Sequence, residues 1–269
     1  AVGLIEMFGP LPSAGPPGGA DIAEFPHIAA LCGFVILCDW LGSDEENFQL
    51  PAGGIDSPPL EKSEADAGAV AAISRRRLDQ PAILTDLAFD ELFTPPGEST
   101  YQPNTLQEEC AAHILGPGLH LIEAPMGMGK TEAALWAAAK LISSGKASGL
   151  YFALPTQLTS NKIHERVGAF LHKALPSSAT LALAHAASWL ESPAKFRIAA
   201  GPAGEGDRTD AAAARTWFTS RRALLARYGV GTIDQALMAA LPVKFAALRL
   251  FGLAAKVVVL DEVHTYDAY

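Results

Sequence analysis

Short apolar runs alternate with helical patterns along the second half of the chain. Apolar runs predict β-strands at four places: from residue 119, and over residues 149–154, 181–184 and 256–260. A strand end or turn is also expected near residues 230–235. Alternation of strands and helices predicts an α/β fold with a parallel sheet and helices on both of its faces. The ligand of such a sheet is expected at the carboxyl ends of the strands.

The first hundred residues have a less regular pattern. Helical patterns cover residues 26–43 and 67–79, whereas residues 80–103 look like a loop. We therefore expect a first region over residues 1–80, a linker over 81–100 and a second region over 101–269. Within the second region, helices are expected around Gln107, from about residue 131, up to about residue 173 and over residues 211–227.

A glycine-rich turn joins the run at residue 119 to the helical pattern that follows it. Gly127, Gly129, Lys130 and Thr131 form the G-K-T arrangement of a Walker A motif. Glycine lets backbone N–H groups approach a phosphate, and the start of the helix adds the positive end of its dipole. We expect Lys130 to reach the terminal phosphates and the Thr131 hydroxyl to bind Mg²⁺. The alternative, a mobile surface turn, is disfavoured by the strand and helix on either side.

An acidic pair ends the last apolar run. Asp261 and Glu262 directly follow residues 256–260. Asp261 is expected to hold Mg²⁺ through water, and Glu262 to polarise the attacking water. Two solvated carboxylates at a strand end are the alternative, and their place after a Walker A motif disfavours it. The two motifs together predict an ATPase core.

Composition narrows the class of protein. The chain has 269 residues, of which 49% are hydrophobic, so a globular protein with a sizeable core is expected. Its formal charge of −9 argues against broad electrostatic binding of nucleic acid, although not against local contacts to one strand. The three cysteines form no CxxC motif, which favours reduced thiols in a cytoplasmic protein. No apolar run is long enough to span a membrane, so no membrane partner is expected.

Four stretches resemble helicase motifs in their order and spacing. APMGMGKTEAAL, LPTQLTSNKI, VGTIDQAL and VVVLDEVHTYDAY resemble motifs I, Ia, Ic and II of the superfamily 2 helicase domain in the CRISPR-associated helicase–nuclease of type I systems. The resemblance implies an incomplete RecA-like P-loop domain over residues 101–269, in a fragment of a longer protein. Phe245 stands where that family is expected to have histidine.

The resemblance also implies roles for individual residues. Lys130 and Glu262 are expected to be catalytic, and the nucleotide is expected to contact Gln107, Met126, Gly127, Met128, Gly129, Lys130, Thr131, Asp261, Glu262 and His264. Gln107 lies about twenty residues before the Walker lysine, the position from which helicases read the adenine edge. His264 would couple the nucleotide state to the neighbouring domain. Thr156, Gln157 and Thr232 are the candidates for contacts to the backbone of a DNA strand.

The stretch GFVILCDWLGSDE resembles the last helix of the HD-type nuclease domain of the same family. The resemblance implies that residues 1–80 are the α-helical remnant of that domain and that Asp39 is a metal ligand. On the residues alone, a structural hydrogen bond explains Asp39 better than a metal does. The other ligands of the family are not in this chain, and one carboxylate cannot hold a catalytic metal. In the full-length protein a divalent transition metal would suit mixed His/Asp ligands.

The implied activity is ATP-dependent unwinding or translocation of single-stranded DNA, 3′ to 5′, coupled to nicking by the HD domain. The implied recruiter is the RNA-guided type I surveillance complex after it has formed an R-loop. Two alternatives remain open: a DEAH-type helicase unrelated to CRISPR, and a non-catalytic, nucleotide-dependent scaffold. Turnover also needs arginine fingers from a second RecA-like domain, so these 269 residues alone are expected to hydrolyse ATP slowly.

Overall fold

The structure is a computed structural model. It describes residues 26–45, 47–48, 61–76, 78–79, 83, 87–95, 97–154, 157–175, 181–184, 222–261 and 263. Of the predicted site residues, Thr156, Glu262 and His264 lie outside this part of the chain. Gln157 lies within a described helix, but its side chain does not belong to the described part. None of the described helices has the length and hydropathy that crossing a membrane requires.

Four strands form one parallel sheet. They are β1 (Gly149–Leu154), β2 (Leu181–Ala184), β3 (Tyr228–Thr232) and β4 (Lys256–Leu260), in the order β2-β3-β1-β4. The apolar runs predicted over residues 149–154, 181–184 and 256–260 are strands with these bounds. Leu154 is in register with Thr232, and Ala153 with Leu260, so the carboxyl ends of β1, β3 and β4 lie at one edge of the sheet.

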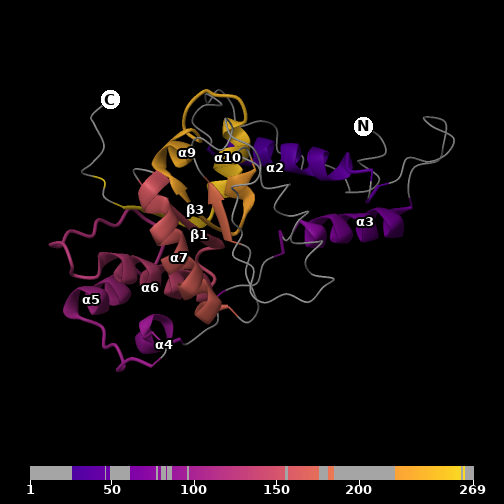
Figure 1. The fold of residues 1–269 in the computed structure, drawn as a ribbon. Helices are drawn as coiled ribbons and strands as arrows, with labels where there is room; N and C mark the ends of the chain where they lie inside the picture. The colour runs from indigo at the N-terminus through magenta and orange to yellow at the C-terminus, as the bar shows by residue number, and fades with distance from the viewer. Residues whose placement is uncertain are drawn as a thin grey trace.

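Helices cover both faces of the sheet, which confirms the α/β prediction (Figure 1). They are α6 (Lys130–Ser143), α7 (Gln157–Ala174), α9 (Ile233–Leu237), α10 (Ala246–Leu253) and the short 3₁₀ helix η4 (Ala223–Leu225). Successive side chains of a strand point to opposite faces. Leu150 and Phe152 accordingly pack against α6 and α7, whereas Tyr151 packs against η4 and α9. All six residues of β1 are buried, because β1 is central in the sheet and covered on both faces.

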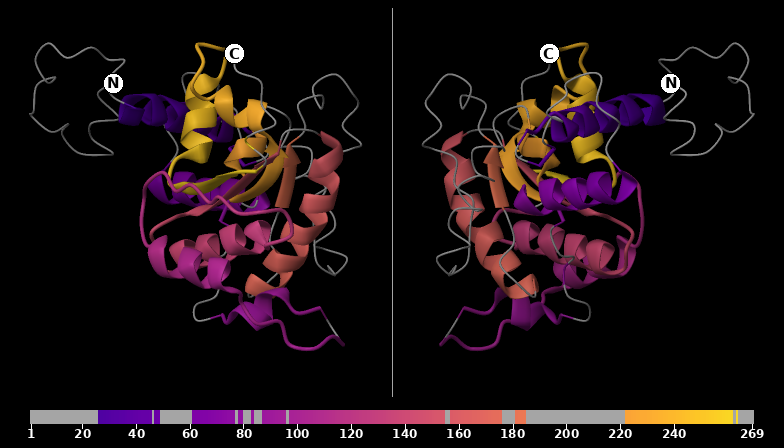
Figure 2. Two further views of the ribbon diagram at one scale, coloured as in Figure 1. Left: turned by 90° about the vertical axis from the view of Figure 1, so that its left-hand side faces the viewer. Right: turned by 90° about the vertical axis from the view of Figure 1, so that its right-hand side faces the viewer.

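The helices of the first half are α2 (Pro26–Gly42), α3 (Lys62–Arg75), α4 (Phe89–Phe93) and α5 (Thr105–His113). They pack on the helices that cover the sheet or on one another: α4 on α7, α5 on α6, α2 on α10 and α3 on α2. α2 lies across α10, and Gly33 makes the close approach possible, because a Cβ there would lie 2.2 Å from the carbonyl oxygen of Ala247. Trp40 adds a ring contact with Phe245, with 5.6 Å between centroids. Figure 2 shows α2 and α10 together on one side of the sheet and α6 on the other.

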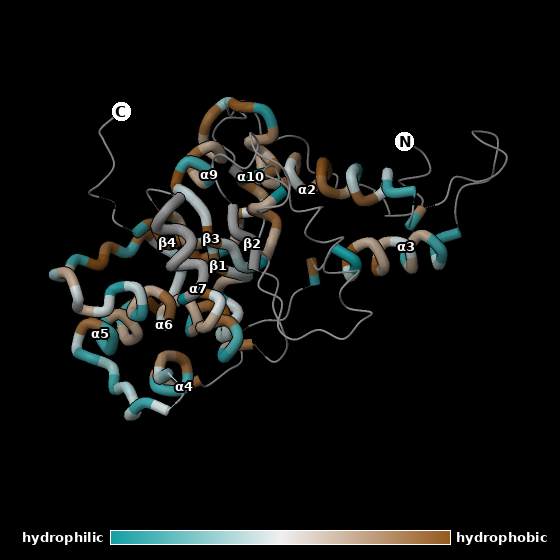
Figure 3. The backbone as a smooth tube through the Cα atoms, viewed as in Figure 1, coloured by the Kyte–Doolittle hydropathy of each residue, from teal (hydrophilic) through white to brown (hydrophobic). Residues whose placement is uncertain are grey.

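The structure contradicts one predicted strand. Residues 119–124 are not a strand, and Leu119 and Leu121 are 100% and 87% exposed. A strand is stable when its backbone groups pair with a neighbour, and none of the described strands pairs with this segment. β4 is therefore the outermost strand on this side of the described sheet, and Val258 and Leu260 are about 40% exposed. Figure 3 shows both hydrophobic and hydrophilic residues along the loop that leads into α6.

Some helices also differ from the predictions. α3 begins and ends earlier than the predicted residues 67–79, and the expected loop over residues 80–103 contains α4. The Glu91 carboxylate accepts a hydrogen bond from the Ala88 N–H (2.8 Å), and the Phe89 ring packs edge-on against Trp136, 5.2 Å between centroids. The helix predicted over residues 211–227 does not reach residue 227. Of its described residues, only Ala223–Leu225 are helical, as η4, and β3 begins at Tyr228.

Candidate nucleotide-binding site

The glycine-rich turn leads directly into α6. Gly127 and Gly129 have φ angles of +81° and +73°, in the left-handed region that side chains with a Cβ rarely adopt. Gly129 is also the N-cap of α6, so the chain curls back immediately before the helix starts. The unpaired N–H groups of the first turn of α6 therefore border this loop. Such an arrangement is suited to binding a phosphate group.

The predicted phosphate-binding lysine folds back over this loop. Lys130 Nζ donates hydrogen bonds to the carbonyl oxygens of Ala124 (2.8 Å) and Pro125 (3.2 Å). An ammonium group has three donors, so these two contacts leave one N–H of Lys130 for a bound phosphate. Thr131 follows in the first helical turn and is half-buried. Lys130 and Thr131, the two residues predicted to bind the magnesium triphosphate here, therefore directly follow the loop in the chain.

Helix α5 holds the loop from the other side. Asn104 and Gln107 form a reciprocal cap, in which the Asn104 side chain accepts from the Gln107 N–H (3.0 Å) and Gln107 Oε1 accepts from the Asn104 N–H (2.9 Å). The remaining donors reach the loop: Asn104 Nδ2 donates to the Met128 carbonyl (3.0 Å) and Gln107 Nε2 to the Gly129 carbonyl (3.3 Å). Gln107 is thus buried and anchors the P-loop.

Sequence reasoning identified Gln107 but not this role. The spacing N-x-x-Q before a helix is the available signal, because it is the pattern of a capping box. The contact with Gly129 has no such signal, since it joins residues 22 positions apart. The structure leaves the predicted reading of adenine by Gln107 untested.

A cavity of about 510 Å³ opens beside the loop. Its lining combines aromatic side chains with two glycines of the P-loop. Its lining consists of Phe89, Phe93, Thr100, Tyr101, Gln102, Asn104, Gln107, Gly127, Gly129 and Glu132. Pockets of this volume accommodate ligands of nucleotide size. Aromatic rings and the glycine-rich loop thus border one cavity, and α4, which the sequence reasoning missed, supplies two of these rings.

Asp261 lies at the carboxyl end of β4. Its backbone N–H donates to the Ala153 carbonyl (3.0 Å), which extends the ladder between β1 and β4 by one residue. The helix that starts at Lys130 contacts β4, and Figure 1 shows the loop before α6 and the end of β4 on the same side of the molecule. The two motifs thus belong to elements that touch. Of the acidic pair, only Asp261 is described.

Thr232 lies at the same edge of the sheet, on β3, but it is only 2% exposed. Its carbonyl oxygen accepts a hydrogen bond from the Tyr151 hydroxyl (2.9 Å), and its own hydroxyl has no partner among the described residues. Contact with a DNA strand would therefore require this edge to open. Gln157 is the first residue of α7, next to the end of β1. The predicted DNA contacts remain predictions.

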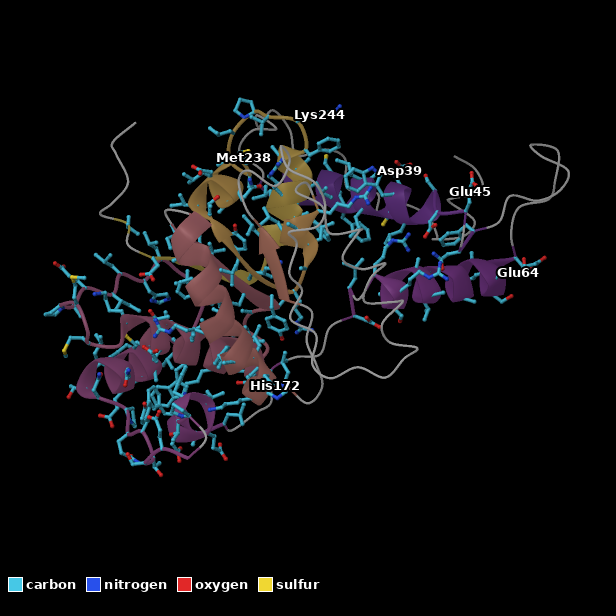
Figure 4. All side chains as sticks on the ribbon, viewed as in Figure 1. Asp39, Glu45, Glu64, His172, Met238 and Lys244 are labelled. Carbon is cyan, nitrogen blue, oxygen red and sulfur yellow. The ribbon has the colours of Figure 1, made fainter. Side chains whose placement is uncertain are left out.

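Asp39 lies on α2, away from the P-loop. Its side chain is exposed, and Figure 4 labels it on the helix. Because α2 packs on α10 and not on α6, Asp39 and Lys130 belong to opposite layers of the molecule. No group of three His, Cys, Asp or Glu residues among the described positions could hold a metal ion. The described residues therefore do not fit a metal centre by themselves, and Asp39 could contribute one ligand at most.

Comparison with known proteins agrees with the resemblance in the motifs. No family model matches the chain. It is 41% identical over 275 residues to the CRISPR-associated endonuclease/helicase Cas3 of Thermus thermophilus, an alignment that covers 97% of the chain. The chain is a homologue of Cas3. The predicted resemblance is thereby confirmed, although the chain spans only 28% of the length of that Cas3 relative.

Solved Cas3 structures share the fold. The crystal structure of T. fusca Cas3 with AMPPNP is 39% identical and superposes with a TM-score of 0.66, over 94% of the chain and 28% of that structure. A pre-nicking CRISPR RNA-guided surveillance complex contains a chain that is 31% identical, with a TM-score of 0.56 over 99% of this chain and 24% of its own. The Cas3 neighbours support the RecA-like helicase fold.

Proposed function

We propose that this chain is the first RecA-like domain, with the adjoining nuclease helix, of a Cas3 helicase–nuclease. The full-length protein would move 3′ to 5′ along single-stranded DNA with ATP hydrolysis and nick that DNA. The observation that carries the proposal is the P-loop that α5 holds in place at the start of α6, on an element that contacts the strand ending at Asp261. The homology to Cas3 and the AMPPNP complex of a Cas3 neighbour support it.

The residues of the two motifs would each bind a different part of the magnesium nucleotide. Backbone N–H groups at Gly127 and Gly129 would bind phosphate oxygens, and Lys130 would bind the terminal phosphate and offset the negative charge that develops there. Thr131 and Asp261 would hold Mg²⁺, which supplies further neutralisation of the phosphates. Glu262 would orient and polarise the attacking water.

The base and the DNA would be bound by neighbouring residues. Gln107 would read the adenine edge with the part of its amide that the loop leaves available. Thr156, Gln157 and Thr232, at the carboxyl edge of the sheet, would contact the backbone of the DNA strand, which carries no sequence information. His264 would pass the nucleotide state to the neighbouring domain.

The nuclease part of the proposal rests on the homology. Asp39 would supply one ligand, and the other ligands of a divalent transition metal would come from outside this chain. The proposed partner is an RNA-guided surveillance complex, because a chain in a complex of that name is similar to this one. A non-CRISPR helicase and a nucleotide-dependent scaffold are the competing functions.

The test is Lys130→Ala in the full-length protein, with Lys140→Ala as the matched control. Lys140 is on the same helix but is exposed at its other end, next to Trp136. We expect Lys130→Ala to abolish DNA-stimulated ATP hydrolysis and translocation, and Lys140→Ala to retain both. DNA degradation should also depend on an R-loop formed by the surveillance complex. If the protein is a scaffold, Lys130→Ala should keep its activity. If it is a non-CRISPR helicase, its activity should not depend on the R-loop.

A further inference from the structure

Glu132 is the charged residue of the cavity beside the P-loop. Of the ten described residues that line this cavity, Glu132 alone carries a formal charge at neutral pH. It directly follows Thr131 in the first turn of α6, where the helix dipole favours a negative side chain. The predicted triphosphate is itself strongly negative. A carboxylate next to a bound triphosphate would be repelled by it, unless a basic residue neutralises the carboxylate and the carboxylate binds another group of the ligand.

Arg166 supplies the neutralising partner. Its guanidinium pairs with Glu132 from α7, and the two residues are 34 positions apart in the chain. The Glu132 side chain is 25% exposed, so it is held between the cavity and the second helix and is not free in solvent. A guanidinium has several donors in a fixed plane and orients a carboxylate. One side of the Glu132 carboxylate is therefore fixed by α7.

The surroundings of Gly129 locate Glu132 relative to the rest of the site. A Cβ on Gly129 would lie 2.4 Å from Gln107 Nε2 and 3.6 Å from Glu132 Oε2. The Glu132 carboxylate therefore lies beside Gly129, and both residues line the cavity. The lining also includes the rings of Phe89, Phe93 and Tyr101.

The covalent structure of a nucleotide indicates which of its groups would lie next to Glu132. With the phosphates on the glycine loop, the ribose lies next to that loop, because it is the part of a nucleotide bonded to the phosphates. A carboxylate can only accept hydrogen bonds, and the ribose 2′ and 3′ hydroxyls are the donors of that part of the ligand. We propose that Glu132 accepts a hydrogen bond from a ribose hydroxyl and is the residue that selects ribonucleotides, with Arg166 as its positioning residue. This inference rests on the proposed ATP site.

The experiment compares the binding of ATP, 2′-deoxy-ATP, 3′-deoxy-ATP and GTP to the full-length protein by calorimetry without DNA. A hydrogen bond to a charged group implies that removal of the relevant hydroxyl weakens binding by about tenfold. In Glu132→Ala the ribose and deoxyribose nucleotides should bind equally well. Arg166→Ala should reduce the discrimination, and Arg166→Lys should restore part of it. The ratio of ATP to GTP affinities should stay unchanged in all three variants.

Glu109→Ala is the matched control. Glu109 is an exposed glutamate on α5 that also pairs with a basic side chain, His113 (2.9 Å), but it does not line the cavity. It should keep the ribose preference. An equal loss of all four nucleotides in Glu132→Ala would show a structural role only, and a changed ATP to GTP ratio would assign Glu132 to the base. Either result overturns the inference, as does wild-type protein that binds both deoxy forms as tightly as ATP. Wild-type protein that binds no nucleotide would overturn the proposed function instead.

Discussion

At the scale of single residues, two glycines with the same backbone conformation test the P-loop. Gly129 and Gly145 have φ angles of +73° and +72°, but only a Cβ on Gly129 would collide with a neighbour, the Gln107 amide. Alanine at either position should cost about 1–2 kcal/mol of stability through backbone strain. Gly129→Ala should in addition displace Gln107 and weaken ATP binding roughly fivefold, as for a lost hydrogen bond. Calorimetry on both variants checks this, and equal ATP affinities would contradict it.

Lys256, the first residue of β4, gives a pH-dependent prediction. Burial, with a smaller contribution from the Arg227 charge, lowers the pKa of this lysine from 10.5 to about 7. Its Nζ donates to the carbonyl oxygens of Leu224 (2.7 Å) and Ala226 (2.6 Å). Between these two pKa values the unfolded chain binds more protons than the folded chain. The free energy of unfolding should therefore rise with pH across this window.

The corresponding variant is Lys256→Met, which removes the titrating group and keeps an apolar side chain of similar length. From pH 7 to pH 9, the free energy of unfolding of the wild-type chain should increase relative to the variant by on the order of 2 kcal/mol. Urea unfolding at both pH values measures the difference. Parallel pH profiles for the two proteins would mean that the lysine keeps its ordinary pKa when folded.

At the scale of elements, the contact between α2 and α10 depends on one small residue. A Cβ on Gly33 would lie 2.2 Å from the Ala247 carbonyl oxygen and 2.6 Å from Phe251 Cβ, so Gly33→Ala has to push the two helices apart. We expect a loss of about 1–3 kcal/mol, as in other overpacked cores. Gly42→Ala, at the end of the same helix with open space around it, is the control and should not destabilise. If thermal unfolding is equally affected in both, the helices do not pack as described.

The elements also show what the sequence could predict. The bounds of β1, β2 and β4 followed from apolar runs, because strands of a parallel sheet are usually apolar along most of their length. The run from residue 119 has the same composition, yet it is not a strand in the structure. The amino-acid composition of a segment does not determine whether a neighbouring strand is available to pair with it. The same limit hid the bond from Gln107 to Gly129, which exists only because the folded chain brings α5 to the P-loop.

At the scale of the whole molecule, the proposed motor site and the proposed nuclease helix lie on opposite layers. Lys130 starts a helix on one face of the sheet, whereas Asp39 is on the helix that covers α10 on the other face. Each proposed activity therefore needs partners that the described residues do not supply: arginine fingers for ATP hydrolysis and further ligands for a metal.

It follows that the isolated 269-residue chain should be a poor ATPase. Without arginine fingers, its hydrolysis should be at least about a thousandfold slower than that of the full-length protein. Phosphate release by both proteins, at saturating ATP and single-stranded DNA, measures the ratio. A full-length rate from the chain alone would show that no second domain takes part in the chemistry.

We infer that the carboxyl end of β4 and the start of α6 together bind one metal triphosphate. A crystal structure of the full-length protein with AMPPNP and Mn²⁺ tests it directly, because the anomalous signal of manganese locates the ion. We expect one ion at the triphosphate, bound to the Thr131 hydroxyl and to Asp261 directly or through one water, with Lys130 on the terminal phosphate. An ion or nucleotide bound away from both Lys130 and Asp261 would contradict it.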